Sequence, residues 1–72
     1  MRIELLTRTT GMRGIDEPQH AGFLPQTPTS RVEAIALIED YTERFDICGT
    51  EKNGWWCRNI NDVHETLLTI RE

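Results

Sequence analysis

The stretch from Ser30 to Phe45, SRVEAIALIEDYTERF, carries the strongest structural signal in this sequence of 72 residues. Ser30 and Glu33 form the S-x-x-E pattern of a capping box, in which the serine oxygen accepts a hydrogen bond from the Glu33 backbone N–H and the glutamate carboxylate accepts one from the serine N–H. The preceding residues 27–29, TPT, resist helix formation and place the start of the helix sharply. The stretch therefore predicts one helix over residues 30–45.

This helix is predicted to be amphipathic. Apolar side chains recur at the spacing that places them in one stripe. The stripe comprises Ala34, Leu37, Ile38, Tyr41 and Phe45, with Ile35 at its edge. The acidic residues Glu33, Glu39, Asp40 and Glu43 gather on the opposite side. An acidic helix face is most often a solvated surface, but it can also steer docking onto a basic partner, and both interpretations stay open.

Size and charge narrow the classes of function. A chain of 72 residues is one domain, and a domain this small has little room for both a core and a deep active-site pocket. Size alone therefore favours binding over catalysis. The net charge is −4 and the eight basic residues are scattered, which argues against direct nucleic-acid binding, because phosphate neutralisation needs clustered Lys and Arg.

The chain is expected to work in the cytoplasm, or in the host cytoplasm if a phage encodes it. No apolar run approaches the roughly 20 residues of a membrane span, so no membrane association is expected. The first residues, MRIELLTRTT, lack the long apolar region of a signal peptide. Two cysteines are too few for a disulfide scaffold and would ordinarily stay as thiols in a reducing compartment.

The region before the helix is predicted as a strand followed by a long loop. Residues 2–8, RIELLTR, indicate an edge or half-exposed strand, which would allow a homodimer through strand pairing. Residues 9–29 contain three glycines and all three prolines, and are expected to be a loop. Phe23 and Leu24 in this loop either pin it over the sheet or offer an anchor to a partner.

Residues 46–59, DICGTEKNGWWCRN, are predicted to form a β-hairpin, because Asn53-Gly54 between two β-rich runs is a strong turn signal. A two-residue Asn53-Gly54 loop places Cys48 diagonal to Cys57 on one face. A three-residue loop ending at Gly54 places the cysteines on opposite faces. Only a four-residue loop sets them directly opposite each other. We favour the first two registers and therefore predict no disulfide.

Trp55 and Trp56 are adjacent in the predicted hairpin, so their side chains point to opposite faces of the sheet. If the helix covers one face, one tryptophan belongs to the core and the other is exposed. Exposed tryptophans are frequent in binding hot spots. The alternative is that the long loop covers the second ring.

The last segment, residues 63–71, fits either a strand or a short helix. Its β-branched content favours a strand that continues the hairpin as a meander.

No catalytic motif is present. Cys48, Cys57 and His64 could form a small metal-binding or thiol-reactive module, but the cysteines are nine residues apart and form no C-x₂₋₄-C knuckle. A nucleophilic cysteine would need an electropositive, accessible place. No oxyanion-hole motif or glycine-rich phosphate loop occurs. We expect neither an enzyme nor a bound cofactor or metal.

The expected fold is α+β, with one amphipathic helix packed on a small antiparallel sheet in the order βαββ(β). In size, charge and element order the chain resembles many small acidic phage proteins that bind and inhibit host machinery, such as anti-CRISPR proteins and RNA polymerase inhibitors. This resemblance implies a non-enzymatic protein that inhibits or modulates a larger partner with a basic surface; a self-associating domain is a further alternative. The candidate contact residues are Trp55, Trp56, Glu39, Asp40, Glu43, Phe23 and Leu24.

Overall fold

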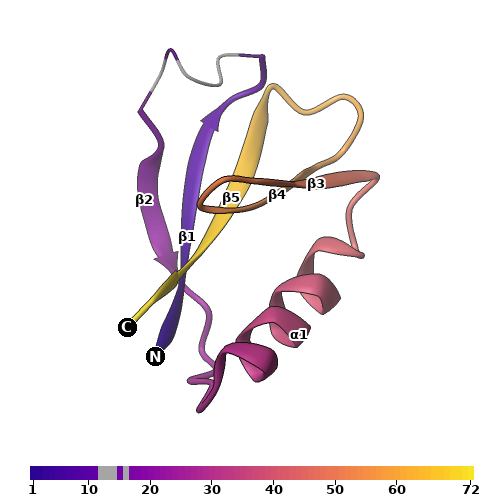
Figure 1. Cartoon of the computed structure of the whole chain (residues 1–72). Helices are drawn as coiled ribbons and strands as arrows, with labels where there is room; N and C mark the ends of the chain where they lie inside the picture. The colour runs from indigo at the N-terminus through magenta and orange to yellow at the C-terminus, as the bar shows by residue number, and fades with distance from the viewer. Residues whose placement is uncertain (12–14, 16) are drawn as a thin grey trace.

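The computed structural model describes residues 1–11, 15 and 17–72. These residues form a small α+β domain with one helix and a five-stranded antiparallel sheet (Figure 1). The elements are β1 (Arg2–Thr9), β2 (Gln19–Phe23), α1 (Arg31–Thr42), β3 (Ile47–Glu51), β4 (Gly54–Arg58) and β5 (His64–Arg71). The strands lie in the order β2-β1-β5-β4-β3, so β2 and β3 form the two edges.

The first strand lies inside the sheet, and its interpretation as an edge strand is wrong. β1 pairs with β5 along its whole length, from Arg2 opposite Arg71 to Thr9 opposite His64. Its other side pairs with β2. Both sides of β1 are therefore paired within the sheet, so β1 offers no free edge for the homodimer that the sequence suggested. Glu4 and Arg8, whose charges favoured an edge position, are both buried.

The predicted loop over residues 9–29 contains the strand β2, so the element order is ββαβββ and the predicted order βαββ(β) is wrong. β2 has no clear alternation of polar and apolar residues, and its register against β1 shifts between Leu5 and Leu6. A short irregular strand of this kind forms because β1 offers an unpaired side, which local sequence cannot reveal. The observed element order therefore does not support the resemblance to small phage proteins.

The helix begins where the capping signal placed it. The Ser30 hydroxyl oxygen accepts the Glu33 backbone N–H at 3.2 Å, as predicted. The Glu33 carboxylate accepts from the Thr29 hydroxyl at 3.0 Å, in place of the predicted bond from the Ser30 N–H. The helix ends at Thr42, three residues before the predicted end, in a tightened turn where the Phe45 N–H bonds the Thr42 carbonyl oxygen.

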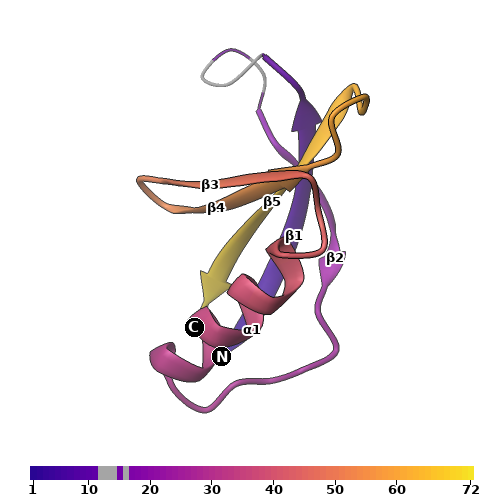
Figure 2. The same ribbon diagram turned by 90° about the vertical axis from the view of Figure 1, so that its right-hand side faces the viewer.

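α1 buries Ala34, Ile38 and Thr42 against the sheet, and its Leu37 and Tyr41 are partly buried against the same core. The outward side is not uniformly polar, because Val32 lies there with 81% of its surface exposed. The helix covers one face of the sheet only (Figures 1 and 2). None of the described helices is long and apolar enough to span a membrane.

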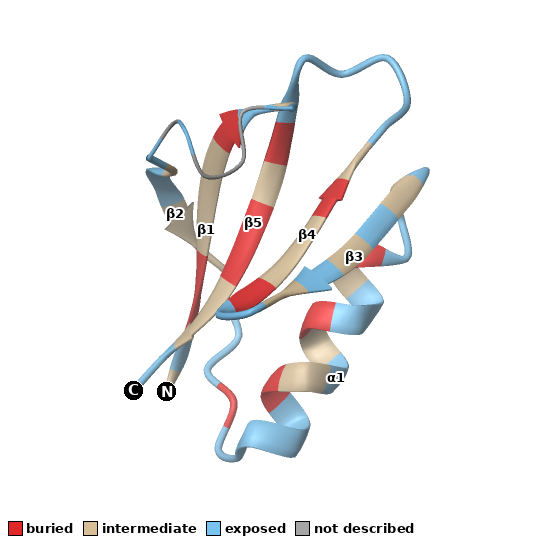
Figure 3. Cartoon of the chain, turned by 45° about the horizontal axis from the view of Figure 1, so that its top comes forward, coloured by how far each residue is buried: buried red, intermediate tan, exposed pale blue. Residues whose placement is uncertain are grey.

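The core lies between α1 and the central strands (Figure 3). Alternate residues of β1, β5 and β4 point toward the helix, as the pleat of a strand requires. Ile3, Leu68 and Cys57 on this helix-covered face are fully buried with Ala34 and Ile38.

The opposite, helix-free face carries Glu4, Arg8, Trp56, Glu65 and Leu67, and it curls inward. Arg8 on β1 contacts Glu51 on β3, although two strands lie between them. In a flat sheet these strands would be roughly 14 Å apart. The contact therefore requires strong twist, and Figure 2 shows the β3–β4 hairpin crossing β1 and β5 at a steep angle.

The hairpin takes the register that we did not favour. Cys48 lies directly opposite Cys57, as expected for a four-residue loop from Glu51 to Gly54, but Glu51 also pairs with Gly54, so the loop itself contains only Lys52 and Asn53. Gly54 belongs to the strand because it packs tightly on β5: a Cβ there would lie 2.6 Å from the Leu68 carbonyl oxygen. Asn53 does not take the positive φ of a type I′ turn.

Residues 63–71, interpreted as a strand with a short helix as the alternative, contain β5 in the structure. This strand pairs with β1 on one side and β4 on the other. Its position between two partners explains why a segment with both helical and strand patterns is extended here.

Candidate functional site

A groove runs between α1 and the edge strand β3. It is formed by the last two turns of the helix, the outer strand and one tryptophan ring, and it encloses about 450 Å³. Its lining residues are Glu39, Thr42, Glu43, Cys48, Gly49, Thr50 and Trp55. Trp55 and Cys48 contribute apolar surface to the groove. We call this feature the α1–β3 groove.

The helix side of the groove is acidic. Glu39 and Glu43 are exposed and lie one helical turn apart, so both carboxylates line the same groove. Neither carboxylate has an ion-pair partner among the residues that the structure describes. The last helical turn contains no basic residue, and the helix dipole adds partial negative charge at this end. The helix side of the groove therefore carries net negative charge.

Asp40, predicted to belong to the same acidic patch, lies elsewhere. Its carboxylate forms an exposed ion pair with Arg44 at 3.0 Å. Asp40 lines a separate depression with Leu24 and Tyr41. The pairing partly neutralises it, so it contributes less to the acidic character of the helix than Glu39 and Glu43 do.

The expectation that one tryptophan is buried and the other exposed is wrong, because both are half-buried. Trp55 packs against the core on the helix-covered face and forms part of the α1–β3 groove. Trp56 lies on the helix-free face above Gly49, where a Cβ would come within 2.8 Å of its ring. The sheltering of Trp56 follows from the curled sheet and the missing side chain at Gly49.

Phe23 and Leu24 do not join Trp55. The Arg2 guanidinium carbon lies 3.7 Å from the centre of the Phe23 ring, at the other edge of the sheet. The Leu24 N–H donates to the Ile3 carbonyl oxygen at 2.9 Å, and its side chain packs against the core. Both residues have intramolecular contacts, which favours the interpretation that they pin the chain onto the sheet.

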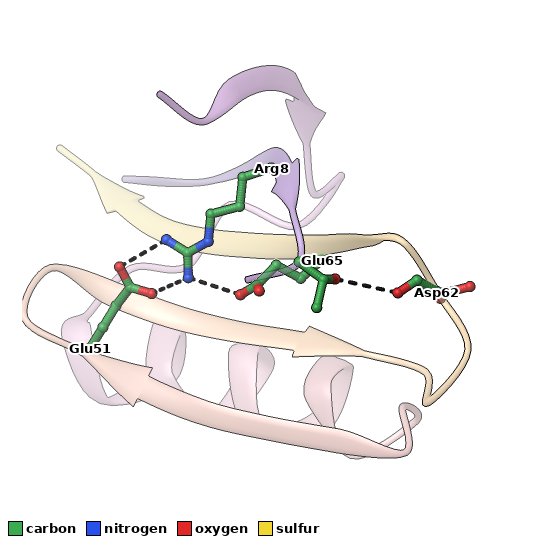
Figure 4. A network of polar contacts seen from close by, with 5 residues as sticks. Arg8, Glu51, Asp62 and Glu65 are labelled. Atoms are coloured by element: carbon green, nitrogen blue, oxygen red, sulfur yellow. Dashed lines mark hydrogen bonds and ion pairs between the residues drawn. The ribbon is translucent and has the colours of Figure 1, made fainter. Parts of the chain in front are cut away.

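Sequence reasoning missed a buried ion cluster on the helix-free face. The Arg8 Nη1 donates to Glu51 Oε2 at 3.1 Å, and Nη2 donates to Glu65 Oε2 at 2.9 Å and to the second Glu51 oxygen. The side chains of Arg8 and Glu65 are each only 3% exposed. Figure 4 shows Arg8 reaching from β1 to Glu51 on β3 and to Glu65 on β5. The hydrogen bonds to Glu51, and then those to Glu65, raise the pKa of Arg8.

A second polar cluster lies further along the same face. The Glu4 carboxylate accepts from the Arg71 Nε at 2.6 Å and contacts the His20 Nδ1 at 2.7 Å. The Arg71 hydrogen bond, followed by that of His20, lowers the pKa of Glu4. Glu4 and Arg8 are four residues apart, which places both on one face of a strand, so this spacing could have indicated a charged face.

The arrangement gives little support to a metal-binding or thiol-reactive module. Cys48 is exposed and Cys57 is buried, and both are free thiols. Burial, with a smaller effect of Cys48, raises the pKa of the Cys57 thiol to about 11, which disfavours the nucleophilic thiolate. His64 is exposed at the start of β5. Across the described ranges, no three His, Cys, Asp or Glu side chains are grouped to hold a metal ion.

Comparisons with protein-family models, with curated proteins and with solved structures found no match to this chain. The fold and the groove define it as a small α+β domain that presents an edge strand beside an acidic helix.

Proposed function

We propose that this chain is a non-enzymatic interaction protein that binds a larger protein partner with a basic surface and inhibits or modulates it. The α1–β3 groove is the proposed binding site, with Trp55 as the anchor and Glu39 and Glu43 as the orienting charges. The host-interference role suggested by size and charge stays a prediction.

One observation carries this proposal: three of the predicted contact residues, Trp55, Glu39 and Glu43, line the same groove although the helix and the hairpin are separate in sequence. An accessible aromatic ring that a partner can bury in a well-packed pocket is typical of an interface anchor. Exposed carboxylates at the rim mainly speed encounter and select the partner, and add less to affinity. Trp56, Asp40, Phe23 and Leu24 lie outside the proposed site.

Affinity capture from a cell lysate with the tagged protein tests the proposal. The wild type should capture a specific protein that Trp55→Ala captures at least about 30-fold more weakly, as expected when a hot-spot residue contributing about 2 kcal/mol is removed. Glu39→Gln/Glu43→Gln, which changes only surface charge, should weaken capture as well. Val63→Ala is the matched control, because Val63 is 68% exposed and lies outside the groove.

Circular dichroism must show that each variant is folded, because Trp55 also contacts the core. If the folded Trp55→Ala protein and the double glutamine variant both capture the same protein as the wild type, the groove is not the binding site.

A further inference from the structure

We infer that the segment bound in the α1–β3 groove is an extended, basic peptide segment of the partner that adds to the sheet as a new strand beside β3. This inference rests on the proposed function and specifies the partner's chemistry. It combines three features of the described residues: the free backbone edge of β3, the absence of the usual protection of an edge, and the acidic groove on the helix side.

The outer side of β3 offers unpaired backbone groups. Because a two-residue loop closes the hairpin, Glu51 and Gly54 form a hydrogen-bonded pair. The pairs then alternate along the ladder, so Gly49 and Ile47 also use their backbone groups toward β4. The N–H and C=O groups of Cys48 and Thr50 consequently point away from β4, and β3 is an edge of the sheet.

β3 lacks the features that normally protect an edge strand from pairing. Such strands usually carry Pro, Lys, a bulge or outward charges. β3, ICGTE, contains neither Pro nor Lys, and its ladder with β4 is regular. The carboxylate of Glu51, its one charged residue, is turned across the sheet to Arg8. The other edge strand, β2, has an irregular register.

Some side chains of a strand added beside β3 would point into the α1–β3 groove. Alternate residues of that strand point to the helix side, roughly 6.8 Å apart. Glu39 and Glu43 are separated by roughly 6 Å along the helix. Lys or Arg at every second position of the partner segment therefore matches the two carboxylates, while an apolar methylene stem covers Trp55. Strand addition with alternate side chains in pockets is a recurring mode of peptide recognition.

A second copy of this chain fits the same edge poorly. Pairing of two β3 strands about a two-fold axis would bring Glu39 and Glu43 of both copies toward one interface. Like charges opposed at an interface disfavour association. Charge complementarity therefore selects a basic segment over self-association.

A synthetic peptide with alternating lysine and valine, TKVKVKVT, is the probe. Its affinity is measured by titration calorimetry, and amide hydrogen exchange of the full chain is recorded by NMR with and without peptide. The expected result is binding with new protection at the amides of Cys48 and Thr50. The same peptide N-methylated at the residues that bond β3 should lose binding, because it keeps its charge but cannot extend the ladder.

Three variants separate the contributions. Thr50→Pro removes one outward N–H at an edge position, where proline is tolerated, and should abolish detectable binding while the fold is retained. Glu39→Gln/Glu43→Gln should weaken binding about tenfold, because two exposed ion pairs each contribute a few-fold. Glu17→Gln/Glu72→Gln makes the same charge change at two exposed residues outside the groove and should bind as the wild type does.

Absence of binding, equal binding of the N-methylated peptide, or protection at β2 in place of β3 would overturn the inference. The proposed function fails separately, in the capture experiment. If capture depends on Trp55 but Thr50→Pro captures the partner normally, the groove binds a protein without strand addition, and only the inference is lost.

Discussion

On the helix-covered face, Ile3, Leu68 and Cys57 pack against α1 without a charged group, whereas the helix-free face buries the guanidinium of Arg8 between Glu51 and Glu65. The first face is stabilised by removing apolar surface from water. The second curls around an ion cluster whose members come from β1, β3 and β5. The comparison indicates that one helix is enough to cover one side, and that sheet curvature with charge pairing takes the place of a second layer.

The largest effect is expected for Arg8→Ala. This change leaves the buried Glu65 carboxylate without the guanidinium, and breaking a buried ion pair costs about 4 kcal/mol. Denaturant unfolding measures the loss. Arg44→Ala, which removes an exposed ion pair with Asp40, is the control and should cost about 1 kcal/mol or less. If the two variants lose equal stability, the ion cluster does not stabilise the helix-free face.

A somewhat smaller effect is expected on the other face for Ile38→Ala. Ile38 is fully buried in the core, and truncation of such a side chain costs about 3 kcal/mol through lost burial and the cavity left behind. Val32→Ala on the same helix should change stability by no more than about 0.5 kcal/mol, because Val32 is 81% exposed. A similar loss in both variants would contradict the position of the helix on the sheet.

The smallest effect concerns alkaline pH. Burial raises the pKa of Cys57 from its ordinary value of 9.0 to about 11. The folded protein therefore holds a proton that the unfolded chain releases, so this contribution to stability is complete below pH 9 and is lost as the pH rises to about 11. Unfolding curves between pH 8 and 11 should show a weaker pH dependence in Cys57→Ala than in wild type.

Tyr41 is unchanged in both proteins of that experiment, and burial raises its pKa too. Cys57 adds a smaller upward shift to the pKa of Tyr41, so Cys57→Ala removes this contribution, which has the same sign, together with that of the thiol itself. If the free energy of unfolding depends on pH identically in the two proteins, the Cys57 thiol is accessible to water. The helix-covered face would then be more hydrated than the structure indicates.

The candidate site was partly predictable. Each half of the α1–β3 groove was recognised separately, as an acidic helix side and a tryptophan hairpin. Trp55 lines the groove with Glu39 and Glu43, and Trp56 does not, because α1 packs on the face of the sheet to which Trp55 points. Asp40 was included because helical spacing places it on the acidic side with Glu39 and Glu43, but in the structure it lines a different depression.

Three features could be predicted from local residue patterns: the α+β class, the helix start at Ser30 and a turn near Asn53. These follow from capping, spacing and turn chemistry, which act over a few residues. The pairing of β2, the hairpin register and the ion cluster depend instead on contacts between distant parts of the chain. Arg8 meets Glu51 and Glu65 across 43 and 57 residues of chain, and contacts of that range exist only when the whole sheet has assembled.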